Sequence, residues 1–169
     1  MRLAIESDIP ILQDLYQESR AHAFRVGFID WPERFSAEYL EEFIEADQLY
    51  CFEDGDTVTA SVKLARSDRV KIWPDDSKDF LYVGKLATAD AVRGQGYVQR
   101  IVLPSIEERA TEMSKIGTRL NVLASNERLR GFYENLGFEL VSIGSVVTEL
   151  TGRTVETAQY QRAISSNQS

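Results

Sequence analysis

Two glycines close together could form an anion-binding loop in the segment "TADAVRGQGYVQRIVLP", residues 88–104. Gly94 and Gly96 flank Gln95 and follow Arg93, which carries a formal positive charge. Amides in a glycine-containing turn and in the first turn of a following helix point N–H groups the same way, and the helix dipole adds partial positive charge. Such a loop suits a phosphate group. An ordinary tight turn would also explain two glycines.

The loop departs from two common nucleotide-binding patterns. Gln99 stands where the pattern G-x-G-x-x-G has its third glycine, and no Gly-Lys-Ser/Thr follows as in a P-loop. A second group of residues lies in "LNVLASNERLRGFYENLGFELV". Asn126 ends an apolar stretch there, and the pair Phe132 and Tyr133 precedes Gly137.

Together the two segments resemble the GCN5-related N-acetyltransferase (GNAT) superfamily. Arg93 and Gly96 match its loop pattern Arg/Gln-x-x-Gly-x-Gly/Ala, and Val98 stands at the last position in place of a small residue. The second segment, from Asn126 to Phe138, matches the pattern Asn-(x)5-Phe-Tyr-(x)3-Gly-Phe. The resemblance therefore rests on two motifs in the expected order.

The resemblance implies an acetyl-CoA-dependent N-acyltransferase that moves an acetyl group directly to an amine, on a small molecule or a protein. Acetyl-CoA would be the co-substrate, with no metal. The implied fold is a single α/β (α+β) domain, with a mixed, mostly antiparallel sheet of about seven strands flanked by about four helices. Two alternatives stay open: a non-catalytic coenzyme A-binding protein, and a nucleotide-binding regulatory domain that uses the same loop.

The resemblance also assigns residues to coenzyme A. The residues that would bind its pyrophosphate are Arg93, Gly94, Gln95, Gly96 and Val98. Leu86 and Thr88, at the end of the preceding strand, would pair with the pantetheine arm as an added strand does. The strands around "FLYVGKLAT" and "TRLNVLAS" would splay to admit the thioester. Asn126 would contact the pantetheine, although capping a helix would also account for it.

Tyr133 would stand near the sulfur, where a phenol can donate a proton to the leaving thiolate. Packing of a helix against a sheet is the simpler role for an aromatic residue there.

For the acceptor site the candidates are Glu18, His22, Asp30 and Trp31. The first three can accept a proton, and Trp31 lies in a segment that shapes the acceptor pocket in this superfamily. Glu18 and His22 would also form an ordinary surface pair at helical spacing.

Composition limits the other functions. The chain has 169 residues, 43% hydrophobic and 27% charged, as expected for one soluble domain. Its net charge of −8 argues against nucleic acid as a partner, and an acidic surface could favour cationic substrates. The single cysteine, Cys51, provides neither a disulfide nor a metal cluster. No apolar run approaches ~18 residues, so we expect no membrane span and a cytoplasmic location, with a homodimer left open.

Hydrophobic periodicity predicts the order β-α-α-β-β-β-α-β-α-β-β over one domain, residues 1–164, with a disordered tail, 165–169. Ser7 or Asp8 should cap the first helix, and Ser36 the second. Pro104 lies inside the third helix, residues 96–115, where we expect a kink. Ile101 is expected to face inward on that helix.

Overall fold

The computed structural model describes residues 1–27, 31–67, 72–75, 77–148 and 151–164. The helices are α1 (Ile9–Arg25), α2 (Ala37–Glu45), α3 (Leu103–Glu112) and α4 (Glu127–Asn135). The strands are β1 (Arg2–Leu3), β2 (Leu49–Asp54), β3 (Thr57–Ala65), β4 (Phe80–Thr88), β5 (Gly117–Leu123), β6 (Glu139–Val147) and β7 (Thr154–Ala163). This order confirms the predicted one. Within the described residues, no helix has the length and apolar content needed to cross a membrane.

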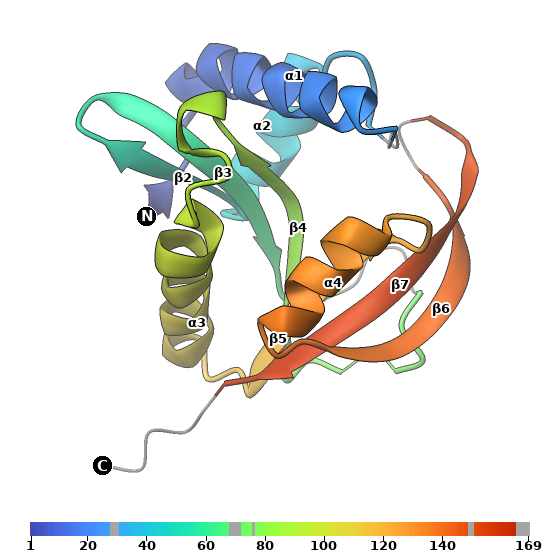
Figure 1. Cartoon of the computed structure of the whole chain (residues 1–169). Coiled ribbons are helices and arrows are strands. Elements are labelled where there is room, and N and C mark those ends of the chain that lie inside the picture. The colour runs from blue at the N-terminus through green and yellow to red at the C-terminus, as the bar shows by residue number, and fades with distance from the viewer. Residues whose placement is uncertain (28–30, 68–71, 76, 149–150, 165–169) are drawn as a thin grey trace.

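The described strands form one seven-stranded sheet in the order β1-β2-β3-β4-β5-β7-β6. Neighbouring strands pair antiparallel except β4 and β5, which pair parallel. The chain runs from β4 through α3 to β5, the crossover that a parallel pair needs. In Figure 1, α3 and α4 cover one face of the sheet, while α1 and α2 lie against the other. The predicted fold class is therefore confirmed.

Alternation along β2 shows how the sheet separates two hydrophobic cores. Tyr50 and Phe52 join the cluster beneath α3 and α4, whereas Leu49 and Cys51 join the cluster beneath α1 and α2. All four side chains are at most 5% exposed. Because successive side chains of a strand point to opposite faces, a run without polar residues fits a strand that is covered on both sides.

Side-chain caps begin two of the helices as predicted. The Ser36 hydroxyl accepts the Tyr39 amide at 3.2 Å, and the Asn126 side-chain oxygen accepts the Leu129 amide at 3.0 Å. Asp8 stands at the N-cap position of α1, one of the two predicted, but its side chain makes no capping hydrogen bond to the helix. The Asp8 carboxylate accepts a hydrogen bond from the Ile5 amide and forms an ion pair with Arg2. It therefore stabilises the segment before α1 rather than the first turn of the helix.

Pro104 does not kink a continuous α-helix. A π-helical turn, Val98–Val102, precedes α3, and Pro104 stands in the first turn of α3. Proline has no amide to donate within a continuous α-helix, and the helix widens to the π-helical pattern in the turn directly before it. The wider turn also rotates the face of the helix, so Ile101 is 44% exposed and Leu103 is buried instead. The inward position predicted for Ile101 is wrong.

Gly117 lies where β5 passes between two neighbours. A Cβ there would meet the Arg162 carbonyl oxygen at 2.5 Å and the Phe80 ring at 2.8 Å. Overpacking of a well-filled core costs about 1–3 kcal/mol, so we expect Gly117→Ala to lower the free energy of unfolding by that amount. Urea denaturation measures it. Gly144→Ala on β6, where the nearest atom is 4.0 Å away, is the control and should leave stability unchanged or slightly higher. Equal midpoints for both variants would contradict the prediction.

Candidate active site

Strands β4 and β5 separate halfway along their length. Their parallel pairing runs from Phe80 and Gly117 to Val83 and Leu120, and the described register has no pair beyond that point. Strand β5 continues to pair with β7 as far as Leu123. The rest of β4 therefore presents one backbone edge without a strand partner, as the predicted splay requires.

A bulge in β4 accompanies the separation. Ser61 pairs with Ala87 and Lys63 with Gly84, so β4 has one residue more than β3 between these pairs. The extra residue is Lys85, whose φ is 51°. A bulge of this kind bends its strand and increases the local twist. The bend turns β4 away from β5, and β4 stays paired with β3.

The bulge also decides which face receives Lys85. Leu81 and Val83 point into the core beneath α3 and α4, and a period of two would send residue 85 there as well. The bulge places Leu86 against that core instead. The Lys85 ammonium lies on the other face, 5.6 Å from the centroid of the Phe35 ring.

The glycine loop follows β4 directly. Gly94 and Gly96 have φ values of 74° and 69°, in the left-handed region that favours glycine. The Arg100 amide makes the first helical bond, 2.9 Å to the Gly96 carbonyl oxygen. Amides just before it have no carbonyl within the helix to bond. Amides at a helix N-terminus are groups that commonly bind anions in proteins.

Arg93 stabilises this loop from inside. Its Nη2 donates to the Thr88 carbonyl at 2.5 Å and to the Ser19 hydroxyl at 3.3 Å, and the guanidinium pairs with Asp90. Ser19 also bonds the Thr88 backbone, with the amide at 3.2 Å and the carbonyl at 3.0 Å. Burial lowers the pKa of Arg93. The sequence assigned Arg93 to a ligand and missed Ser19, because α1 and β4 are far apart in the chain.

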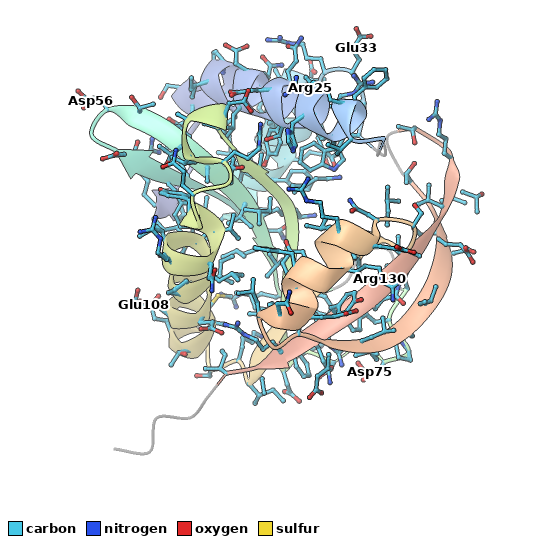
Figure 2. The ribbon with its side chains drawn as sticks, viewed as in Figure 1. Arg25, Glu33, Asp56, Asp75, Glu108 and Arg130 are labelled. Atoms are coloured by element: carbon cyan, nitrogen blue, oxygen red, sulfur yellow. The ribbon has the colours of Figure 1, made fainter. Side chains whose placement is uncertain are left out.

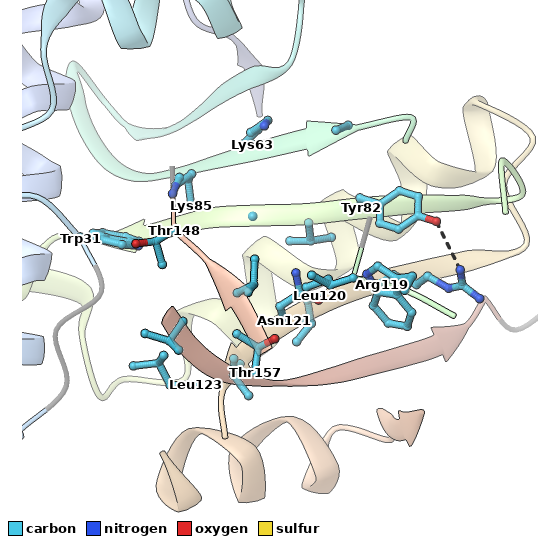
Figure 3. A pocket seen from close by; sticks show the side chains of 18 of the residues that line it. Trp31, Lys63, Tyr82, Lys85, Arg119, Leu120, Asn121, Leu123, Thr148 and Thr157 are labelled. Carbon is cyan, nitrogen blue, oxygen red and sulfur yellow. Dashed lines mark hydrogen bonds between the residues drawn. The ribbon is translucent and has the colours of Figure 1, made fainter. Parts of the chain in front are cut away.

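A cavity of about 250 Å³ opens on the face that carries α2, where β4 and β5 separate. Trp31 and Tyr39 form part of its wall, and Lys85 lies on the same side (Figure 3). Val83 and Val122 also line it, although both belong to the core beneath α3 and α4. The cavity therefore reaches into the gap between the two strands.

The sequence matches the model of the acetyltransferase (GNAT) family over residues 11–138. The chain belongs to this family. A comparison with curated proteins gives no significant match.

Solved structures share the fold of this acetyltransferase over almost its full length. A GNAT-family acetyltransferase from Listeria monocytogenes is 20% identical, with a TM-score of 0.75 over 96% of this chain and 92% of its own. A putative acetyltransferase from Salmonella typhimurium, solved with acetyl-CoA, is 16% identical, with a TM-score of 0.67 over 99% and 95%. A ribosomal-protein-alanine N-acetyltransferase from Brucella melitensis is 20% identical, with a TM-score of 0.68 over 96% and 98%.

The expected acceptor residues of this acetyltransferase do not gather in one place. Trp31 lines the cavity. Glu18 instead accepts the Asp90 amide at 2.6 Å, beside the glycine loop. Burial first, and then the charge of Arg93 in that loop, lower the pKa of His22. Asp30 lies outside the described residues.

Positive charge collects around His22. Arg25 on α1, Arg93 in the glycine loop and Arg128 on α4 all lower the pKa of its imidazole. Figure 2 draws the side chains of the described residues, with Arg25 labelled on α1. Glu18 and Asp90 lie beside the same loop, and Asp90 pairs with Arg93, so the charge of these arginines is partly neutralised.

Tyr133 is buried on the α4 side of the sheet. It is 6% exposed, and its ring packs edge-on against Phe132 and Phe138. Burial raises the pKa of its hydroxyl to about 12. Among the described residues, this hydroxyl has no hydrogen-bond partner. Asn126, which caps α4, lies three residues beyond the end of β5, at the same end of the gap.

The hydrogen bond from the Thr88 amide to Ser19 offers a direct test of how α1 holds the end of β4. We expect Ser19→Ala to accelerate exchange of the Thr88 amide by about fivefold, because one net hydrogen bond contributes about 1 kcal/mol. Hydrogen-exchange NMR measures this rate. Ser105→Ala is the control, since that hydroxyl only donates to the Ile101 carbonyl oxygen within its own helical segment. An unchanged Thr88 rate would show that Ser19 does not hold this strand end.

Proposed function

We propose that this acetyltransferase transfers the acetyl group of acetyl-CoA directly to an amine acceptor. The observation that carries the proposal is the gap between β4 and β5. The glycine loop follows β4, one of the two strands beside this gap, and the cavity reaches into the gap. Coenzyme A could lie in such a gap with its phosphates at the loop, while the acceptor enters from the cavity.

The loop suits the pyrophosphate of coenzyme A. Backbone amides of Gln95, Gly96 and Val98 would donate to it, with added attraction from the neighbouring arginines. The contact at Val98 would be made by its backbone amide, which every residue except proline has. Gly94 supplies a second left-handed position that turns the loop. Arg93 would act mainly by holding the loop in shape.

The pantetheine arm would pair with the free edge of β4. An extended chain can add to an exposed strand through backbone hydrogen bonds. Leu86 and Thr88 face the same edge, because residues two apart in a strand share a side. Thr88 already bonds Ser19 and Arg93, so Leu86 offers the pairing that needs no rearrangement. Asn126 would contact the arm from the α4 side.

The chemistry needs one bond formed and one broken. The nitrogen lone pair attacks the thioester carbonyl carbon, the C–N bond forms, the C–S bond breaks, and sulfur leaves as the thiolate. The nitrogen loses one proton and the sulfur gains one, with no oxidation or reduction. Tyr133 would donate to the sulfur, because its high pKa keeps the phenol protonated and its hydroxyl has no partner among the described residues.

Binding of acetyl-CoA at the glycine loop is testable by thermal denaturation. Acetyl-CoA at ~100 times its Kd should stabilise the protein by about 2.7 kcal/mol, whereas ATP and NAD should not. We expect Gly96→Glu to abolish this shift, because a carboxylate would meet the pyrophosphate. Gly152→Glu is the matched control, since Gly152 also has a left-handed φ, of 64°, but lies in the turn between β6 and β7. A normal shift in Gly96→Glu would remove the loop from the site.

The role of Tyr133 is testable from the acetylation rate of a variant and from how that rate depends on pH. We expect Tyr133→Phe to lower kcat by about tenfold or more, with little change in acetyl-CoA affinity. Because burial raises the pKa of Tyr133 to about 12, the phenol stays protonated as the pH rises. The deficit should therefore be constant from about pH 6 to about pH 10, while both rates rise as the acceptor ammonium, pKa ~10.4, loses its proton.

Steady-state kinetics under conditions where chemistry limits the rate measures this deficit. An unchanged kcat would make Tyr133 a packing residue. If acetyl-CoA binds and no amine releases the thiol, the chain is the non-catalytic coenzyme A-binding protein instead.

A further inference from the structure

One buried residue of β3, Thr59, bonds both ends of the segment that contains the glycine loop. Its backbone carbonyl oxygen accepts a hydrogen bond from the Ala89 amide at 2.9 Å, directly after β4. Its hydroxyl lies 2.7 Å from the hydroxyl of Tyr97, the residue that follows Gly96. Thr59 is 5% exposed, and β3 is paired with a strand on each side. The segment from Ala89 to Tyr97 therefore begins and ends at one fixed point of the sheet.

A second bulge, in β3, brings the Thr59 side chain to the loop. Between two pairs of their register, β3 has one residue more than β2, and that residue is Thr59. Strict alternation would place Thr59 on the face of Ser61, whose hydroxyl contacts that of Tyr16 on α1. The Thr59 hydroxyl instead meets Tyr97, which packs against the core beneath α3 and α4. Bulges redirect side chains in this way, and they are frequent beside functional sites.

The hydrogen bonds at Thr59 have a defined direction. Its hydroxyl donates to the Phe52 carbonyl oxygen at 3.2 Å. A hydroxyl has only one hydrogen, so Tyr97 must be the donor in the bond between the two side chains. Replacing Tyr97 with phenylalanine therefore removes this donor, keeps the ring, and leaves the bond from Thr59 to Phe52 in place.

The residues between the two ends of this segment pack little themselves. Gly94, Gln95 and Gly96 are all exposed, and both glycines have left-handed φ values. Glycine loses more conformational freedom on ordering than any other residue. A loop that is already held in its ligand-binding shape avoids this cost when the ligand arrives. The bond from Arg93 to the Thr88 carbonyl holds the middle of the segment, and Thr59 holds its ends.

We propose that Tyr97 is a positioning residue, which holds the glycine loop through Thr59 in the shape that receives the pyrophosphate of coenzyme A. The proposal rests on the coenzyme A binding proposed above, and Tyr97 is not among the residues that the sequence assigned to it. The two bonds of Thr59 also fix the loop relative to the end of β4, where the pantetheine arm would pair. Loss of the Tyr97 bond should therefore weaken a ligand that reaches the loop and spare a ligand that uses β4 alone.

Two ligands separate the loop from the strand edge. Acetyl-CoA would contact both, whereas S-acetylpantetheine has the same arm and thioester but no pyrophosphate. We expect Tyr97→Phe to weaken acetyl-CoA binding about fivefold, the effect of one net hydrogen bond, and to leave S-acetylpantetheine binding unchanged. NMR titration measures both dissociation constants, including that of a weak ligand.

Variants of Thr59 test whether Tyr97 acts through this residue. Thr59→Val should weaken acetyl-CoA binding about as much as Tyr97→Phe, and the double variant should lose no more, because both substitutions remove the same bond. Thr59→Ser keeps the hydroxyl and should restore tight binding. Tyr50→Phe is the matched control. Tyr50 is also 5% exposed, and its hydroxyl accepts a bond from Arg109 on α3 at 3.2 Å, away from the loop.

The outcomes separate this proposal from the proposed function. Unchanged acetyl-CoA binding in Tyr97→Phe, or equal weakening of both ligands, overturns the positioning role and leaves coenzyme A binding intact. Additive losses in the double variant also overturn it, because Tyr97 would then act without Thr59. Thermal denaturation without ligand shows which variants fold, and Tyr97→Phe decides the question if Thr59→Val does not. Absence of acetyl-CoA binding by the wild-type protein contradicts the proposed function itself.

Discussion

The arrangement of this acetyltransferase depends on one extra residue in β4. The bulge at Lys85 keeps β4 paired with β3 while the strand turns away from β5 after Val83. A sheet interior normally satisfies both edges of every strand, so an unpaired edge in the middle of a sheet is costly unless another group bonds it. Here Ser19 and Arg93 bond one end of that edge, at Thr88. The remainder is the part that a ligand with an extended backbone could complete.

The same bend divides the site between two faces of the sheet. Tyr133 lies in the core beneath α3 and α4, and the cavity lies on the face that carries α2. Side chains of the diverging strands, such as Val83 and Val122, belong to both the core and the cavity lining. A reaction in the gap could therefore receive its proton donor from one side and its acceptor from the other. The separation also lets Tyr133, the proposed donor, stay buried, which keeps the pKa of its hydroxyl high.

Local charge and total charge differ in this protein. The net charge of −8 is a sum over the whole chain, whereas Arg25, Arg93 and Arg128 lie around His22, beside the loop where the phosphates of coenzyme A would lie. Electrostatic interactions fall off within about 10 Å at moderate ionic strength, so nearby side chains dominate over the sum. The total charge of the chain therefore does not identify a small substrate.

The sequence by itself determined the features that depend on neighbours in the chain. Ser36 and Asn126 cap their helices, Gly137 has the left-handed φ of 81° that ends α4, and the order of strands and helices follows the periodicity. The two motifs were sufficient to identify the family and to place the glycine loop. Each of these features is set by bonds within a few residues, which a local pattern can show.

Only the tertiary structure decided which distant residues meet. A period of two would bury Lys85, and the bulge that turns it to the cavity arises from pairing with β3. Glu18 and His22 lie beside the glycine loop rather than in the cavity, because α1 packs across the end of β4. The π-helical turn before Pro104 likewise exposes Ile101. These outcomes depend on how elements dock against one another, and contacts between residues far apart in the chain leave no periodic signal in the sequence.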